Sequence, residues 1–251
     1  MKFNLVITAS DKARFTQFVT VHKNHDFVKR RIQRNIKHIG VSVTQHAFWK
    51  KLIVCLVTTM NRSGENGVVS KFVKRKSDLL DIQSCLSRKG LRKYAAEVLS
   101  ESGIWRAQVI AGEIALAAET MNKGEWKNLK PQLNSLQRKT NAQRERAVAR
   151  YLQKREDKIA LFKGIGPKQS RNLLQGMGLS KYEIPLDSRM INVLRELDFP
   201  VPVSATALSD EDYYCFVLDI LQDILARVGV LPCVFDACAF ASKEKPKQVA
   251  A

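Results

Sequence analysis

Leu161-Phe-Lys-Gly-Ile-Gly-Pro-Lys168 is the stretch of this 251-residue sequence that decides the fold. Its centre, Gly164-Ile-Gly166, predicts a tight turn between two helices, because glycine tolerates backbone angles and close approaches that other residues resist. Pro167 suits the first turn of the following helix, where its missing N–H is not needed. Ile165 is expected to be an apolar pin that plugs the turn into the two-helix core. These features predict a helix-hairpin-helix motif over residues 156–176.

The turn of such a motif is suited to binding a DNA phosphate. It leaves unpaired backbone N–H groups at the start of the next helix, and the helix dipole adds to their attraction for an anion. The motif also occurs in polymerases, ligases and junction-binding proteins, so by itself it indicates DNA and no particular chemistry. The residues that we expect to contact DNA here are Lys163, Gly164, Ile165, Gly166, Gln169, Ser170 and Arg171.

The charge distribution also favours a nucleic acid. The chain carries 42 Lys and Arg against 24 Asp and Glu, a formal charge of +18. Such an excess indicates a polyanionic partner or a large solvated surface. Residues 138–171 hold eleven basic and three acidic side chains, whereas residues 201–240 hold one Arg and six acids. A basic stripe beside a hairpin is typical of a phosphate-binding surface, although a basic run alone would favour a solvated helix face.

Hydrophobic periodicity predicts an all-α protein without convincing strands after residue 45. We expect a basic N-terminal arm of uncertain structure at 1–45, a helical region at 46–242 and a frayed tail at 243–251. No run of 18 apolar residues is present, so no transmembrane helix and no membrane partner are expected. The N-terminus lacks the layout of a signal peptide, which predicts a cytoplasmic protein, nucleoid-associated in a bacterium.

Cysteine spacing argues against a metal cluster. The five cysteines, at positions 55, 85, 215, 233 and 238, show no paired CxxC spacing. We interpret them as core thiols in a reducing compartment and expect no metal site.

Three segments, taken together, resemble the helix-hairpin-helix Gly/Pro–Asp superfamily of DNA glycosylases, which includes endonuclease III and 8-oxoguanine glycosylase. The segments are Leu52-Ile-Val-Cys-Leu-Val-Thr-Thr-Met-Asn-Arg62, Phe162-Lys-Gly-Ile-Gly-Pro-Lys-Gln-Ser-Arg-Asn-Leu-Leu174 and Ile184-Pro-Leu-Asp-Ser-Arg-Met-Ile-Asn-Val-Leu194. The resemblance covers about residues 46–240 and implies a two-lobed helical fold that acts as a monomer on double-stranded DNA. The C-terminus lacks the four close cysteines of an iron–sulfur cluster, so no cofactor is expected, with a monovalent cation at the hairpin as an alternative.

The resemblance also implies a catalytic pair. Asp187 lies 19 residues after Lys168, which matches the family's spacing between its hairpin lysine and its aspartate. A carboxylate stabilises the positive charge that develops on the sugar when a base departs, and a neutral lysine can attack the anomeric carbon and form a Schiff base. Members with lysine at this position also cleave the strand as AP lyases. Taken singly, Asp187 is an ordinary helix N-cap and Lys168 an ordinary phosphate contact.

A base must leave the helical stack before it can be excised, and a side chain fills the gap. Met60 and Asn61 are the candidate wedge, because an apolar side chain such as Met can be inserted between bases. Trp49, Tyr213 and Tyr214 are weaker candidates for the base pocket, since aromatic rings in general are more often core residues.

Two kinds of alternative remain open. The excised base is either an oxidised or alkylated lesion or a hypermodified phage base, which would mean genome defence. The chain could instead be a non-catalytic helix-hairpin-helix protein that binds DNA structure, or a basic scaffold for RNA.

Overall fold

A computed structural model of the chain describes residues 6–61, 64, 66–137, 140–156 and 159–244. The described part is helical apart from one two-stranded ladder, which confirms the all-α prediction. The helices are α1 (Ala9–His22), α2 (Asp26–Arg31), the π-helix η1 (Ile32–Ile36), α3 (Gln45–Val57), α4 (Val68–Lys74), the 3-10 helix η2 (Asp78–Leu80), α5 (Ile82–Ser87), α6 (Leu91–Glu101), α7 (Ala107–Asn122), α8 (Trp126–Ser135), α9 (Ala142–Leu152), α10 (Pro167–Gly176), α11 (Ser188–Glu196), the 3-10 helix η3 (Ala207–Ser209), α12 (Glu211–Arg227) and α13 (Pro232–Ala241). No single described helix is long and apolar enough to cross a membrane; α12 and α13, bent by 95°, pass that test of length and composition only as a pair.

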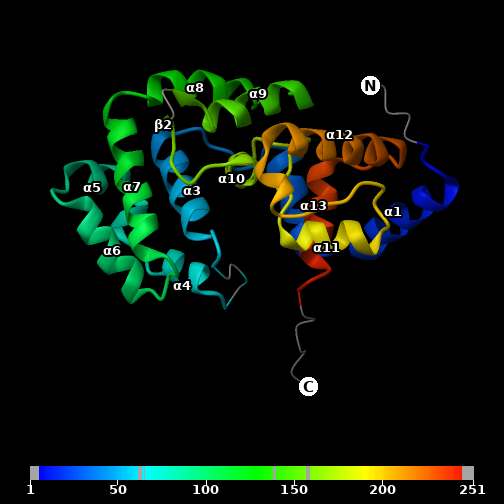
Figure 1. Cartoon of the computed structure of the whole chain (residues 1–251), viewed down its shortest axis with the longest axis horizontal. Helices are drawn as coiled ribbons and strands as arrows, with labels where there is room; N and C mark the ends of the chain where they lie inside the picture. Colours follow the sequence, from blue (N-terminus) through cyan, green and yellow to red (C-terminus); the bar gives the residue numbers. More distant parts are fainter. Residues whose placement is uncertain (1–5, 62–63, 65, 138–139, 157–158, 245–251) are drawn as a thin grey trace.

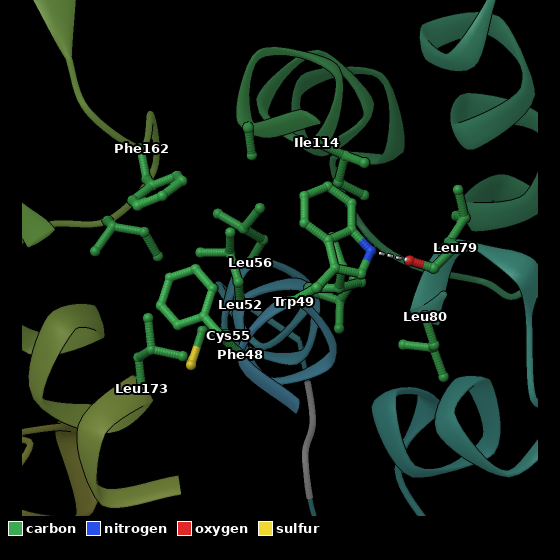
Figure 2. Close-up of a cluster of buried hydrophobic side chains, with 14 of the residues drawn as sticks. Phe48, Trp49, Leu52, Cys55, Leu56, Leu79, Leu80, Ile114, Phe162 and Leu173 are labelled. Atoms are coloured by element: carbon green, nitrogen blue, oxygen red, sulfur yellow. Dashed lines mark hydrogen bonds between the residues drawn. The ribbon is translucent and has the colours of Figure 1, made fainter. Parts of the chain in front are cut away.

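The helices enclose two hydrophobic cores, which form the two lobes of Figure 1. The first core lies among α3 to α10, where Trp49 of α3 packs beside Ile114 of α7 (Figure 2). The indole nitrogen of Trp49 donates a hydrogen bond of 3.0 Å to the backbone oxygen of Leu79, so its polar atom is satisfied inside the core. The second core is built from α1, α2, α11, α12 and α13.

Residues 6–36 of the N-terminal segment are part of the second lobe and do not form a separate arm. Phe15 and Val28 are buried in the second core, and the Phe15 ring stacks on Phe235 of α13 with centroids 5.5 Å apart. Asn35 of η1 is fully buried and donates to the backbone oxygens of Gln175 and Ser180, at 3.1 and 2.9 Å. Sequence periodicity missed this packing because the segment's few apolar residues are interrupted by many basic ones.

The approach to the hairpin differs from the prediction. The sequence pattern suggested a helix leading directly into the turn and no strand after residue 45. Instead α9 ends at Leu152, and β1 (Arg155–Glu156) and β2 (Ile159–Ala160) then pair antiparallel. The backbone N–H of Leu161 donates to Lys154 at 2.8 Å, which closes this short reversal. The first helix of the motif is therefore α9, which packs against α10.

A buried carboxylate fixes the loop that follows α10. Glu145 of α9 is fully buried, and its oxygens accept hydrogen bonds of 2.8–2.9 Å from three consecutive backbone N–H groups, those of Lys181, Tyr182 and Glu183. Three backbone bonds to one carboxylate hold the loop in a single conformation. This loop leads directly to the start of α11, so the loop's rigidity places the candidate aspartate.

Candidate active site

The hairpin turn requires glycine at its first position. Gly164 has φ +87°, and a Cβ atom there would lie 2.7 Å from Glu113 Oε2 and 2.9 Å from Leu56 Cδ2. Side chains other than glycine are strained at this backbone angle and would also clash. Ile165 is buried in the first core, which confirms that it pins the turn. Gly166 has φ −102° and no atom within 4 Å of an added Cβ, so a side chain would fit there without a clash.

Lys168 lies in the first turn of α10, half-buried near the edge of the first core. Burial lowers the pKa of its ammonium group, and the positive charge of Arg189 acts in the same direction. The negative charge of Asp187 opposes the shift, so the two groups lie within range of electrostatic interaction, although no ion pair joins them. A lysine with a lowered pKa is neutral, and hence nucleophilic, in a larger fraction of molecules.

Asp187 is the N-cap of α11. Its Oδ1 accepts hydrogen bonds from the backbone N–H groups of Arg189 and Met190, at 3.0 and 3.1 Å. Its Oδ2 accepts from the Arg189 guanidinium through Nε at 2.9 Å and through Nη2. The capping interpretation is thus correct, and it is compatible with catalysis because the same carboxylate interacts electrostatically with Lys168. The Arg189 guanidinium in turn lies over the Phe240 ring, 4.5 Å from its centroid.

The backbone before Asp187 is tied to α12. Tyr214 accepts a hydrogen bond from the backbone N–H of Leu186 at 2.6 Å and donates one to the oxygen of Ile184 at 2.9 Å. The ring is fully buried, so Tyr214 is a structural residue that positions the aspartate, and its prediction as a base-pocket residue was wrong.

The other predicted pocket aromatics also lie elsewhere. Trp49 is fully buried in the first core, where no base can reach its ring. Tyr213 packs on the second core, and its hydroxyl donates to the backbone oxygen of Pro202 at 2.5 Å. These residues were candidates for the base pocket only because aromatic rings can stack on bases. Their large apolar area instead packs against the protein's own cores.

Three of the predicted DNA contacts face the interior of the protein. Arg171 is fully buried and bonds through Nε to Glu183 at 2.9 Å and through Nη2 to Glu211 at 2.7 Å. Gln169 donates to the oxygen of Cys55 at 2.9 Å, and Ser170 donates to that of Pro167 at 3.0 Å. These side chains join α10 to its neighbours. The sequence gives no sign that these side chains are interior. Arg is normally exposed and is buried only when it is paired, and its partners are distant in the sequence.

Of the remaining predicted contacts, Ile165 is buried, and the other three lie on an accessible face of the turn. Lys163 and Gly164 are exposed, and Gly166 is half-buried. A pocket of about 350 Å³ adjoins Gly166 and Pro167 and is also lined by Asp210. A monovalent cation at the turn stays a prediction. Within the described ranges, no group of three His, Cys, Asp or Glu side chains is arranged to hold a metal ion.

The wedge candidates lie in the loop after α3. Met60 is 74% exposed and has φ +60°, a backbone conformation that is uncommon for residues other than glycine. Asn61 is held in place, since its Oδ1 accepts from the backbone N–H of Trp105 at 2.8 Å and its Nδ2 donates to the oxygen of the same residue. Trp105 is itself 65% exposed. Sequence analysis missed Trp105, because its contact with Asn61 depends on the packing of distant segments.

Solved structures of 8-oxoguanine DNA glycosylases share this fold. The enzyme of Thermotoga maritima matches with a TM-score of 0.68 and 19% identity, over 93% of this chain and 97% of its own. That of Methanocaldococcus jannaschii matches with a TM-score of 0.66 and 21% identity, over 92% of each chain. The Methanocaldococcus jannaschii glycosylase/lyase bound to a 15mer DNA containing 8-oxoguanine matches with a TM-score of 0.65 and 19% identity, over 91% of this chain and 96% of its own. No protein-family model matches the chain, and no curated protein sequence does.

Proposed function

We propose that this protein is a DNA glycosylase that excises a damaged base and then cleaves the strand through Lys168. The observation that carries the proposal is the pairing of Lys168 and Asp187. A half-buried lysine whose pKa is lowered by burial lies within electrostatic range of a carboxylate that is oriented by Arg189 and by two backbone N–H groups. Titratable groups perturbed in this way are typical of functional sites.

The geometry supports a covalent mechanism. The neutral Nζ of Lys168 attacks the anomeric carbon of the flipped nucleotide, so that an N–C bond forms as the glycosidic bond breaks. The base leaves with the electron pair of that bond and takes up a proton. Asp187, ionised and fixed at the helix start, stabilises the positive charge on the sugar. The attached amine then loses a proton, and the bond between C1′ and the ring oxygen breaks as that oxygen takes up a proton, which leaves a protonated Schiff base at C1′. The Schiff base acidifies C2′, and loss of the C2′ proton breaks the C3′–O bond, expels the 3′ phosphate and cuts the strand.

The base that we propose to test first is 8-oxoguanine, because it is the base named for the structurally similar enzymes. The exposure of Met60 and Trp105 supports a wedge role for them, because an exposed apolar side chain can be inserted into the gap that a flipped base leaves. An alkylated base and a hypermodified phage base are further arms of the same test.

Borohydride trapping tests the proposal directly. Duplexes carrying each candidate base are incubated with the protein and borohydride, and covalent adducts and released base are measured. We expect an adduct that Lys168→Gln abolishes and that the exposed control Lys163→Gln retains. Asp187→Asn keeps the helix cap and should slow base release at least a hundredfold. Absence of base release and of adduct from every duplex would refute the proposal and leave a DNA-structure-binding protein.

A further inference from the structure

Arg189 holds the Asp187 carboxylate with a side chain that is itself partly exposed. Its Nε donates to Asp187 Oδ2 at 2.9 Å, and its Nη2 donates to the same oxygen. The Arg189 side chain is 39% exposed. Ion pairs at such exposure contribute little stability, because water screens the charges and a long side chain loses rotamer freedom when it pairs. A further contact is therefore needed to keep the guanidinium on the carboxylate.

The ring of Phe240 supplies this further contact. Cζ of Arg189 lies 4.5 Å from the ring centroid, within the range of a cation–π interaction. The ring of Phe27, from α2, stacks on Phe240 with centroids 4.1 Å apart and 17° between the ring planes. Phe27 itself packs against the second core. A continuous series of contacts thus runs from α2 through Phe240 and Arg189 to Asp187.

The helix α2 is attached to α13 at a second point. Arg31 lies four residues after Phe27, and its Nη1 bonds at 2.9 Å to Oδ2 of Asp236, which lies four residues before Phe240. The two helices therefore run antiparallel here, with contacts one turn apart. Cζ of Arg31 also lies 5.3 Å from the centroid of the Phe27 ring. Together these contacts fix the Phe27 ring against α13, so that Phe27 decides where the Phe240 ring lies.

We propose that Phe27 is a positioning residue for Asp187, acting through the Phe240 ring and the Arg189 guanidinium. The proposal rests on the proposed base-excision function, because it gives the N-terminal segment a part in catalysis by Asp187. Removal of the Phe27 ring leaves space beside Phe240, which can then tilt and release Arg189. The Asp187 carboxylate then keeps its two backbone N–H donors and loses the guanidinium that holds Oδ2. A carboxylate held less firmly stabilises the developing charge on the sugar less well.

The chain offers a matched control for Phe27→Leu. Phe15 of α1 stacks on Phe235 of α13 with centroids 5.5 Å apart, so Phe15→Leu also removes a ring contact between the N-terminal segment and α13. Because Phe15 is 1% exposed and Phe27 is half-buried, the control should cost at least as much stability. Among the described ring contacts, Arg189 lies over Phe240 alone. Phe27→Tyr is the conservative rescue, because it keeps the ring.

The position of Arg189 is measured without turnover, by hydrogen exchange of arginine Nε–H groups followed by NMR. The Arg189 signal is assigned by its loss in Arg189→Met. We expect slow exchange in the unmodified protein and in Phe15→Leu, because this Nε–H is bonded to Asp187. Phe27→Leu should exchange about tenfold faster, and Phe27→Tyr should restore slow exchange. The same exchange rate in Phe27→Leu as in the unmodified protein would overturn the proposal.

The effect on catalysis is measured as base release in a single turnover, with protein in excess over the duplex. Phe27→Leu should slow release about tenfold, and its affinity for a duplex with an abasic analogue should not change. The double variant Phe27→Leu/Arg189→Met should be no slower than Arg189→Met alone, because both substitutions break the same series of contacts. Additive slowing in the double variant, or equal slowing by Phe15→Leu, would indicate general destabilisation and refute the positioning role.

Failure of the proposed function has a different signature. The unmodified protein would then release no base from any duplex, while the exchange of the Arg189 Nε–H would still decide whether Phe27 positions the guanidinium. If the unmodified protein releases base and Phe27→Leu releases it equally fast, the proposed function stands and the role of Phe27 is wrong.

Discussion

Gly164→Ala should destabilise the protein far more than the same substitution two residues later. At Gly164 the left-handed φ of +87° costs a side chain about 1–2 kcal/mol. The new methyl group would lie 2.7 Å from Glu113 Oε2 and 2.9 Å from Leu56 Cδ2, and relieving such overpacking costs about 1–3 kcal/mol more. Together these effects lower the free energy of unfolding by about 2–5 kcal/mol. Gly166 has φ −102° and no atom within 4 Å of an added Cβ, so Gly166→Ala is the matched control.

Thermal and urea unfolding followed by circular dichroism measure both variants. For a chain of this size each kcal/mol shifts Tm by about 2–4 °C, so Gly164→Ala should melt roughly 4–20 °C lower and Gly166→Ala within about 3 °C of the unmodified protein. The double variant Gly164→Ala/Glu113→Ala should recover part of the loss, because the nearest clashing atoms are removed. Equal melting temperatures for the two single alanine variants would refute the geometry of the turn.

Three further outcomes follow from the site and its supports. Adduct formation should rise with pH as Lys168 deprotonates, and Arg189→Met should move that rise to higher pH, because the arginine's charge lowers the pKa of Lys168; a shift to lower pH in trapping assays would contradict this. Arg171→Met should cost about 1–3 kcal/mol in urea unfolding, since it removes the hydrogen bond to Oε2 of the buried Glu183 while Arg146 still holds Oε1; an unchanged free energy of unfolding would refute that pairing. Met60→Ala should leave Tm unchanged and weaken binding of an abasic duplex severalfold, measured by fluorescence anisotropy, because the side chain is 74% exposed; unaltered binding would exclude it as a wedge.

The sequence could pair Lys168 with Asp187 because each is positioned by short-range features; their catalytic role stays a prediction. Pro167 starts one helix and the Asp187 side chain caps another, and these local signals are visible in a sequence. The spacing of 19 residues also matched the resemblance. The aromatic predictions failed for the opposite reason. Nothing local distinguishes Trp49, which packs in the core, from Trp105, which lies at the surface beside the wedge loop.

The sequence by itself determined the helical class and the glycine turn with its apolar pin Ile165, because periodicity, helix capping and glycine's backbone freedom act over a few residues. Only the tertiary structure decided that residues 6–36 belong to the second lobe and that Arg171 is an interior ion-pair residue. These outcomes depend on burial and on charges brought together from distant parts of the chain. A single basic residue has the same local pattern whether it faces water, a carboxylate or a ligand.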